Sequence, residues 1–181
     1  MARRTLDDMG LFLEVLAFSA YKHRAQRRKD REASAYINHP IALARVLRNE
    51  GGVTDSATLC AAILHDTIED TKTTRTELVK AFGRGIAGVV MEVTDDKGIK
   101  KPKRKQLQVE HAPHLSRRAK LVKLADKICN LRDIRNSPPM GWSRTRKREY
   151  FEWAKRVVDG LRGVNRPLEL AFDREYRRRP R

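Results

Sequence analysis

The sequence predicts an all-α protein of about eight to ten helices. Apolar residues recur at three- and four-residue spacings along most of the chain, and no stretch alternates apolar with polar residues as a strand would. Capping residues and glycines separate these apolar stripes at short intervals. The chain has 181 residues and no internal repeat or interdomain linker. We therefore expect one domain over 1–181, with a core at about 5–172 and a basic tail at 173–181.

The N-terminal half is expected to be helical apart from one polar loop. Thr5 and Asp8 are placed as a capping box for the first helix, and Pro40 suits the first turn of the second. Thr74 is placed to cap the fourth helix, which Gly83 ends. The predicted elements are a helix at 6–26, a loop at 27–35, and helices at 38–50, 55–69, 74–83 and 85–94.

The C-terminal half begins with a cationic segment. Residues 97–105 hold six lysines and arginines and no acid, and are predicted as a loop leading into a short helix that ends near Pro113. Ser116 is placed to cap a helix over 116–133, and the segment 136–141 breaks the chain. An aromatic helix from Ser143 and a last helix from about Pro167, fraying at 177–179, complete the predicted fold.

The charge balance points to a polyanionic partner. Forty lysines and arginines against 23 acidic residues give a net charge of +17, which suits nucleic acid or a phosphorylated small molecule, although a merely basic surface is the alternative. A nucleic-acid-binding module is disfavoured, because the sequence has no zinc-finger spacing or ribonucleoprotein motif, and most of its few aromatic residues lie on apolar stripes. We therefore expect no specific nucleic-acid partner.

The sequence also indicates the compartment. Cys60 and Cys129 lie in apolar helical contexts typical of reduced core residues. No signal-peptide pattern opens the chain, and no apolar run approaches the roughly 20 residues of a membrane span. The sequence thus predicts a cytoplasmic protein with no membrane partner.

The densest cluster of chemical groups is His65-Asp66 followed by Glu69-Asp70. On a continuous helix Glu69 would lie over His65, and Asp70 over Asp66, so that one face would carry an imidazole and three carboxylates. Charge of that density beside an apolar run needs a cation or a function to compensate it. The cluster therefore predicts a metal site.

Two distant residues are candidates to join this site. His39 precedes Pro40 at a helix start, and Asp126 lies on the apolar stripe of its helix. Two histidines and two aspartates suit Mn²⁺ or Fe²⁺ and, less specifically, Zn²⁺, and such an ion makes bound water a nucleophile near neutral pH. The alternatives are a capping role for His39 and an ion pair of Asp126 with Lys123 or Lys127.

Four segments carry a resemblance to a known family: Tyr-Ile-Asn-His-Pro at 36–40, Ala-Ile-Leu-His-Asp-Thr-Ile-Glu-Asp at 62–70, Glu-Val-Thr-Asp-Asp-Lys at 92–97 and Leu-Val-Lys-Leu-Ala-Asp-Lys-Ile-Cys-Asn-Leu at 121–131. They resemble the HD-domain hydrolases of the RelA/SpoT superfamily. The resemblance continues through 141–143 and 149–154 and covers about residues 10–172 in the expected order. Within the superfamily the chain is most similar to the stand-alone small alarmone hydrolases, including their animal forms.

The resemblance implies an HD-domain helical bundle that holds one Mn²⁺ per chain. Glu69 and Asp70 are the implied catalytic pair, with the division of acid and base roles left open. The implied metal ligands are His39, His65, Asp66 and Asp126. The implied substrate-binding residues are Arg28, Lys29 and Asn130 near the nucleotide, and Lys101 and Arg146 near phosphate.

The implied substrate is guanosine tetra- or pentaphosphate (ppGpp or pppGpp), which loses its 3′-pyrophosphate to give GDP or GTP. Long RelA/SpoT proteins carry synthetase and regulatory domains for which 181 residues leave no room, so we expect hydrolysis alone. Alternatives on the same scaffold are removal of the 2′-phosphate of NADPH, an activity associated with the animal relatives, and nucleotide 5′-phosphatase activity. The sequence indicates neither the oligomeric state nor a preference between the two alarmones.

The residues support this chemistry independently. Asn130 lies one helical turn after Asp126 and so faces the same way, with capping of a backbone group as its alternative role. An acidic site would repel a polyphosphate, which the basic segments at 27–29, 97–105 and 144–147 would steer inward, although each single cation is equally suited to a solvated surface. The chain departs from the family at 30–35, where the relatives usually carry a Gly-Pro turn beside the nucleobase.

Overall fold

The computed structural model describes residues 7–180, which form nine α-helices and no strand. A π-helical turn, Val46–Glu50, continues α2, and a 3₁₀ turn, Ala112–His114, continues α6. The predicted all-α class is confirmed. The helices are α1 (Asp8–Lys22), α2 (Asn38–Arg45), α3 (Ser56–Leu64), α4 (Thr67–Asp70), α5 (Arg75–Val93), α6 (Lys101–His111), α7 (Arg117–Asn136), α8 (Arg144–Asp159) and α9 (Arg166–Arg177).

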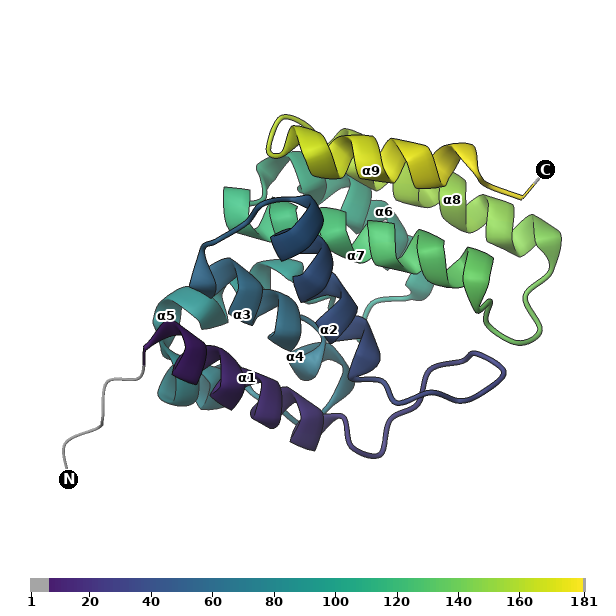
Figure 1. Ribbon diagram of the computed structural model, residues 1–181. Coiled ribbons are helices and arrows are strands. Elements are labelled where there is room, and N and C mark those ends of the chain that lie inside the picture. The colour runs from purple at the N-terminus through teal and green to yellow at the C-terminus, as the bar shows by residue number, and fades with distance from the viewer. Residues whose placement is uncertain (1–6, 181) are drawn as a thin grey trace, which may run out of the picture.

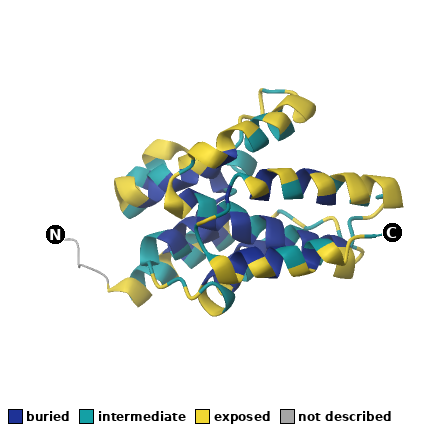
Figure 2. Cartoon of the chain, turned by 90° about the horizontal axis from the view of Figure 1, so that it is seen from above, coloured by how far each residue is buried: buried dark blue, intermediate teal, exposed yellow. Residues whose placement is uncertain are grey.

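Helix α7 lies at the centre of the molecule (Figure 1). It contacts α2, α3 and α5 as well as α8 and α9, so it joins the two halves of the bundle. Leu124, Ile128 and Leu131 on this helix are almost fully buried. Figure 2 shows buried residues gathered on the inner sides of the helices and exposed residues on the outer turns. A polar side chain of α7 that points inward therefore lies next to the hydrophobic core.

Side-chain caps fix where most of the longer helices begin. Asp7 caps α1 by accepting the N–H of Gly10, whereas the predicted capping residue Thr5 lies outside the described residues. Four further caps stand where the sequence placed a helix start, and each accepts a backbone N–H from three residues further on. They are Asp55, Thr74, Ser116 and Ser143.

The predicted continuous helix over 55–69 is wrong. Helix α3 ends at Leu64, Asp66 adopts φ −101° and ψ 0°, and a short helix α4 follows. The break occurs where side chains, in place of further helix N–H groups, take the last carbonyls of α3. Because the helix is interrupted, Glu69 does not lie over His65 on one helix face as predicted.

Three other boundaries differ from the prediction or refine it. Helix α1 ends at Lys22, and the segment as far as Gln26 forms a turn in which the N–H of Gln26 donates to the carbonyl of His23. Helix α6 begins at Lys101, so half of the predicted cationic loop is helical. The predicted interruption at Gly83 is confirmed as a non-helical residue within α5, with a φ of +87° that favours glycine.

Helix α9 extends beyond residue 172, into the segment predicted as a basic tail. Helix α9 runs to Arg177, and Glu175 is buried with its carboxylate paired to Arg132 and Arg135 of α7. Burial of a charged group requires such partners, so this last part of α9 belongs to the packed bundle.

The state of the two cysteines agrees with the sequence prediction. Cys60 and Cys129 are both free and buried. Between residues 7 and 180, no helix combines the length and apolarity needed to cross a membrane.

The Arg132–Glu50 pair joins the π-helical turn to α7, and we expect it to make folding depend on pH. Two guanidinium nitrogens donate to the two carboxylate oxygens at 2.6 and 2.8 Å. The hydrogen bond from Arg132 lowers the pKa of Glu50 despite partial burial. The pair thus stabilises the fold above the unfolded-state pKa of glutamate and is lost as the pH falls through the lower folded-state pKa.

We predict that Glu50→Gln lowers the free energy of unfolding by about 1–3 kcal/mol near pH 7 and by less near pH 4. Urea unfolding at the two pH values measures this. Glu110→Gln on α6, where the carboxylate is exposed, is the matched control and should change stability by less than about 0.5 kcal/mol. Equal stabilities of Glu50→Gln and the wild type at both pH values would contradict the prediction.

Candidate metal centre and active site

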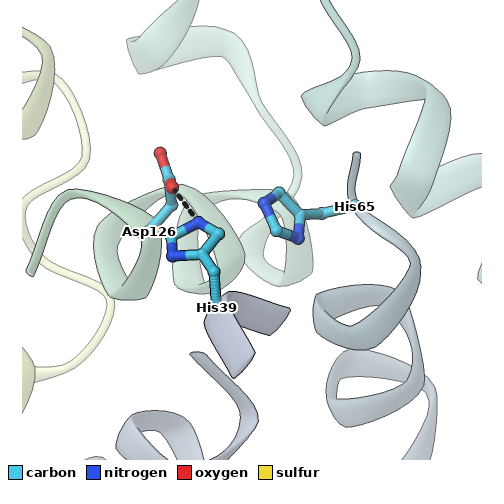
Figure 3. Close-up of side chains that lie close together, drawn as sticks. All are labelled: His39, His65 and Asp126. Carbon is cyan, nitrogen blue, oxygen red and sulfur yellow. Dashed lines mark hydrogen bonds and ion pairs between the residues drawn. The ribbon is translucent and has the colours of Figure 1, made fainter. Parts of the chain in front are cut away.

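Three residues from distant parts of the chain meet beside α7. His39 comes from the first turn of α2, His65 follows the end of α3, and Asp126 lies in the middle of α7. One ligand atom from each lies within 4.8 Å of the others. Figure 3 shows the two imidazoles and the carboxylate pointing toward one another. The structure thus brings these three candidate residues together.

The end of α3 holds the His65 ring in a defined orientation. Because α3 stops at Leu64, its last carbonyls have no helical partner. Nδ1 of His65 lies 2.8 Å from the carbonyl of Ala62, and Ser19 Oγ donates to the carbonyl of Ile63 at 2.8 Å. A carbonyl oxygen can only accept, so Nδ1 carries the proton and Nε2 faces the cluster.

His39 is turned by two carboxylates rather than by its own helix. Nε2 lies 3.2 Å from Asp126 Oδ1, and Nδ1 lies 3.7 Å from Asp133 Oδ2. The N-cap position of α2 is Ile37, and no side chain caps that helix end. The alternative role of His39 as a helix cap is therefore wrong, and its ring is directed into the cluster.

Asp66 lies beside this cluster rather than within it. Oδ2 of Asp66 lies 2.9 Å from Nε2 of His65 and also accepts a hydrogen bond from the Tyr36 hydroxyl. Among the described residues, the set of mutually close ligand atoms contains the two histidines and Asp126 but not Asp66. A ligand role for Asp66 stays a prediction.

Charge in the cluster favours a cation. Burial alone would lower the pKa of His65, but Asp66 and Asp126 raise it to about 9. Burial would likewise raise the pKa of Asp126, yet Lys127 and the imidazoles hold it well below its usual value. Nδ1 of His39 is buried and has no hydrogen-bond partner within residues 7–180. Nε2 of His65 is also buried, with the Asp66 carboxylate 2.9 Å away. Buried ring nitrogens beside carboxylates fit a divalent metal ion.

Asp126 is also held by its own helix. Lys127 Nζ lies 2.9 Å from Asp126 Oδ2, and Asn130 Nδ2 donates to Oδ1 at 2.6 Å. The predicted alternative of an ion pair with Lys127 is thus present alongside the cluster. The amide of Asn130 bonds this carboxylate, so its alternative role at a backbone group is wrong. Lys127 is buried, and its ammonium lies 4.5 Å from the centroid of the Trp153 ring.

Glu69 and Asp70 on α4 face two different cavities. Glu69 lines a cavity of about 210 Å³ together with the metal-binding candidates. Its carboxylate accepts the N–H of Asp95 at 3.2 Å and lies 3.6 Å from Arg104. Burial, followed by the charges of Asp66 and Asp95, raises the pKa of Glu69. A carboxyl group with a raised pKa beside a metal site suits proton transfer.

Asp70 lines the neighbouring cavity of about 400 Å³. Its carboxylate accepts from Gln26 Nε2 at 3.0 Å and pairs with Lys97. His39 and Asn130 border both cavities, so the two cavities are neighbours and are together called the recess. The other side chains that line the larger cavity include Arg28, Lys29, Tyr36, Asp133, Trp142 and Tyr150.

The predicted phosphate-binding cations lie near this recess without lining it. Partial burial, and then the charges of Arg146 on α8 and Lys29 on the α1–α2 loop, lower the pKa of Lys101 on α6. The Arg146 guanidinium lies 4.4 Å from the centroid of the Trp142 ring. Arg28 pairs with Asp133. Arg28 and Lys29 line the larger cavity, whereas phosphate binding by Lys101 and Arg146 stays a prediction.

Sequence reasoning missed several residues of the site. Tyr36 was read as part of a motif but not as the donor to Asp66. Gln26 was placed inside a helix, and nothing in its neighbours indicated a bond to Asp70. Lys127 was considered as a partner of Asp126, but its contact with Trp153 depends on how α8 packs against α7.

We predict that the isolated protein binds Mn²⁺ and that Asp126→Ala or His65→Ala weakens binding by at least about 100-fold, because each removes a donor atom. Isothermal titration calorimetry with MnCl₂ measures the affinity, and circular dichroism checks the fold. His114→Ala, which removes an exposed imidazole from the 3₁₀ turn, is the matched control and should bind Mn²⁺ as the wild type does. Unchanged affinity in Asp126→Ala would exclude this cluster as the metal centre.

This chain is similar in sequence and fold to several known proteins. The HD domain family matches residues 15–152. A Xenopus tropicalis protein named guanosine-3′,5′-bis(diphosphate) 3′-pyrophosphohydrolase MESH1 is 56% identical, over 93% of this chain and 94% of the relative. The Homo sapiens protein of the same name is also 56% identical, over 92% and 93%.

A solved structure is also similar to this chain. It is described as a metazoan ortholog of SpoT that hydrolyzes ppGpp and plays a role in starvation responses. It superposes with a TM-score of 0.91 at 47% identity and covers 98% of each chain. This chain therefore belongs to the HD domain family, among the relatives of the MESH1 proteins.

Proposed function

We propose that this protein hydrolyses the 3′-pyrophosphate of guanosine tetra- or pentaphosphate, giving GDP or GTP and pyrophosphate. The observation that carries the proposal is the buried His39–His65–Asp126 cluster, which opens onto a cavity flanked by cations. Relatives at 56% identity are named for this activity, and the superposed structure is described as hydrolysing ppGpp.

The proposed cofactor is one Mn²⁺ per chain. His39, His65 and Asp126 would hold it, with Asp66 as the fourth protein ligand. Two imidazoles with carboxylate oxygens form a mixed nitrogen and oxygen set that suits Mn²⁺ or Fe²⁺. When bound, the ion supplies Lewis-acid stabilisation of phosphoryl oxygen and lowers the pKa of water.

Glu69 and Asp70 are proposed to handle the protons. Water attacks the phosphorus that is bonded to the 3′-oxygen, the bond between that phosphorus and the 3′-oxygen breaks, and the 3′-oxygen takes up a proton. One of the two carboxylates accepts the proton of the attacking water, and one can return a proton to the leaving oxygen. The raised pKa of Glu69 supports its part in this exchange.

The larger cavity is proposed to bind the nucleoside. At about 400 Å³ it lies within the usual range of small-molecule sites. The indole of Trp142 and the ring of Tyr150 offer apolar faces for a base, and Asn130 offers an amide. Arg28 and Lys29 are the proposed charged contacts on the α1–α2 loop.

Lys101 and Arg146 are proposed to bind phosphate at the entrance. Partial burial and then the charge of Arg146 lower the pKa of Lys101, and a bound polyanion would relieve the repulsion between the two cations. Arg146 is held in place by its contact with the Trp142 ring. Fixed cations can also stabilise the charge that develops during phosphoryl transfer.

The proposed location is the cytoplasm, and the proposed unit is one domain over residues 1–181. Two free buried cysteines are typical of reducing compartments. The described helices share one hydrophobic core that extends from α1 to α9. A small nucleotide is the proposed partner, with no specific nucleic-acid partner and no membrane partner.

We predict that the wild type with Mn²⁺ releases pyrophosphate from ppGpp and that Glu69→Gln and Asp70→Asn each lower kcat by about 10²–10⁴-fold. Ion-exchange chromatography of the nucleotides measures turnover, and calorimetry should show Mn²⁺ affinity within about threefold of wild type for Asp70→Asn. Glu77→Gln on α5 removes a carboxylate that pairs with Lys22, and serves as the control with unchanged turnover.

The same assay separates the alternatives. NADPH and simple nucleotides are added as competing substrates. Faster turnover of NADPH than of ppGpp would replace the proposed function with a 2′-phosphatase. Binding of nucleic acid that weakens steeply with salt and ignores chelation of the metal, without turnover of any nucleotide, would replace it with a binding module.

A further inference from the structure

Two side chains that take no part in the proposed reaction, Gln26 and His23, form a chain of hydrogen bonds that ends at the Asp70 carboxylate. Gln26 Nε2 donates to Asp70 Oδ2 at 3.0 Å, and Nδ1 of His23 lies 2.6 Å from Gln26 Oε1. His23 is only 2% exposed. Lys97, which pairs with the other oxygen of Asp70, has a side chain that is 51% exposed.

The carboxylate end of this chain of hydrogen bonds fixes the direction of each bond. An ionised carboxylate can only accept, so the amide nitrogen of Gln26 must face Asp70 and its carbonyl oxygen must face His23. That carbonyl oxygen can only accept in its turn, so Nδ1 of His23 carries the proton. Turning the Gln26 amide over would break both bonds at once. The orientation of the amide is therefore determined from both ends.

The backbone around Gln26 is also fixed, although no helix contains it. Its N–H donates to the carbonyl of His23 at 2.9 Å, and its carbonyl accepts the N–H of Tyr36 at 3.2 Å. The His23 and Tyr36 rings lie 4.7 Å apart between centroids. The Tyr36 hydroxyl donates to Asp66. Gln26 and Tyr36, which are paired through their backbones, therefore direct one side chain to Asp70 and the other to Asp66.

We propose that Gln26, supported by His23, is a positioning residue that sets the orientation of the Asp70 carboxylate for the reaction. The inference rests on the proposed function. An exposed ion pair such as Lys97–Asp70 contributes little to a fixed geometry, because water and side-chain freedom compete with it. The part-buried bond from Gln26 is the contact that can hold Asp70 at the wall of the nucleoside cavity, which both residues line.

The size of the effect follows from the cost of a misplaced catalytic group. A displacement of about 1 Å can lower a rate by about 100-fold. Gln26→Leu keeps much of the side-chain volume but removes both hydrogen bonds. We expect kcat for ppGpp with Mn²⁺ to fall by about 10–100-fold, with KM and Mn²⁺ affinity within about threefold of wild type. His23→Phe keeps a ring against Tyr36 and should lower kcat by a smaller factor, about 3–10-fold.

The matched control is Gln106→Leu on α6. Gln106 is exposed, and its amide donates to Glu110 rather than to the site. The Gln106→Leu substitution makes the same chemical change as Gln26→Leu but away from the cavity, so kcat should stay within about twofold of wild type. Thermal unfolding of each variant shows whether the fold is retained.

A double-mutant cycle separates positioning from a general structural effect. If Gln26 acts through Asp70, adding Gln26→Leu to Asp70→Asn should lower kcat by less than about twofold further. A kcat of Gln26→Leu within twofold of wild type, or a full additional loss in the double variant, would overturn the proposal.

A second substrate keeps the two proposals apart. Bis(p-nitrophenyl) phosphate is hydrolysed by many metal-dependent phosphoesterases and needs no nucleoside cavity. A wild type that cleaves it but not ppGpp would refute the proposed function, while the ratio of wild type to Gln26→Leu on this ester would still support or overturn the role of Gln26. Turnover of ppGpp by the wild type, with no difference in Gln26→Leu, would refute the positioning role alone.

Discussion

The buried carboxylate of Asp126 is the constraint on which the site depends. It sits on the inward face of α7, where an unpaired charge would be strongly destabilising. Lys127, Asn130 and His39 all direct donors or ring nitrogens at its two oxygens. His39 and His65 in turn lie with ring centroids 5.3 Å apart. One carboxylate at the edge of the core thus sets how α2, α3 and α7 meet.

Most of the helical architecture could be predicted from the sequence, because it depends on local signals. Apolar stripes, capping residues and Gly83 mark the helices directly. The end of α3 could not be predicted in this way, because its apolar run has no breaker. That break is made by Ser19, 44 residues away, and by the ring of His65, which take carbonyls that a continuing helix would have used.

The candidate site could likewise be predicted only in part, because some of its contacts depend on distant residues. His39, His65 and Asp126 were predicted from their motifs, and Asn130 from its place one turn after Asp126, and the structure brings all four together. The contacts of Gln26 and Tyr36 could not be predicted, since a loop residue reaches its partner only through the path of the folded chain. Metal ligation by the two histidines, Asp126 and Asp66 remains a prediction, as does the division of roles between Glu69 and Asp70.

The two indoles of the chain both stand at the recess. Trp142 lines the larger cavity against the Arg146 guanidinium, and Trp153 lines the smaller one beneath the Lys127 ammonium. The sequence contains no other tryptophan. Ultraviolet emission excited at the indole band therefore arises from rings whose neighbouring charges would change on the proposed binding of an anion or a metal ion. The protein would thus carry its own fluorescent reporter of occupancy, and replacing either ring with phenylalanine would separate the two signals.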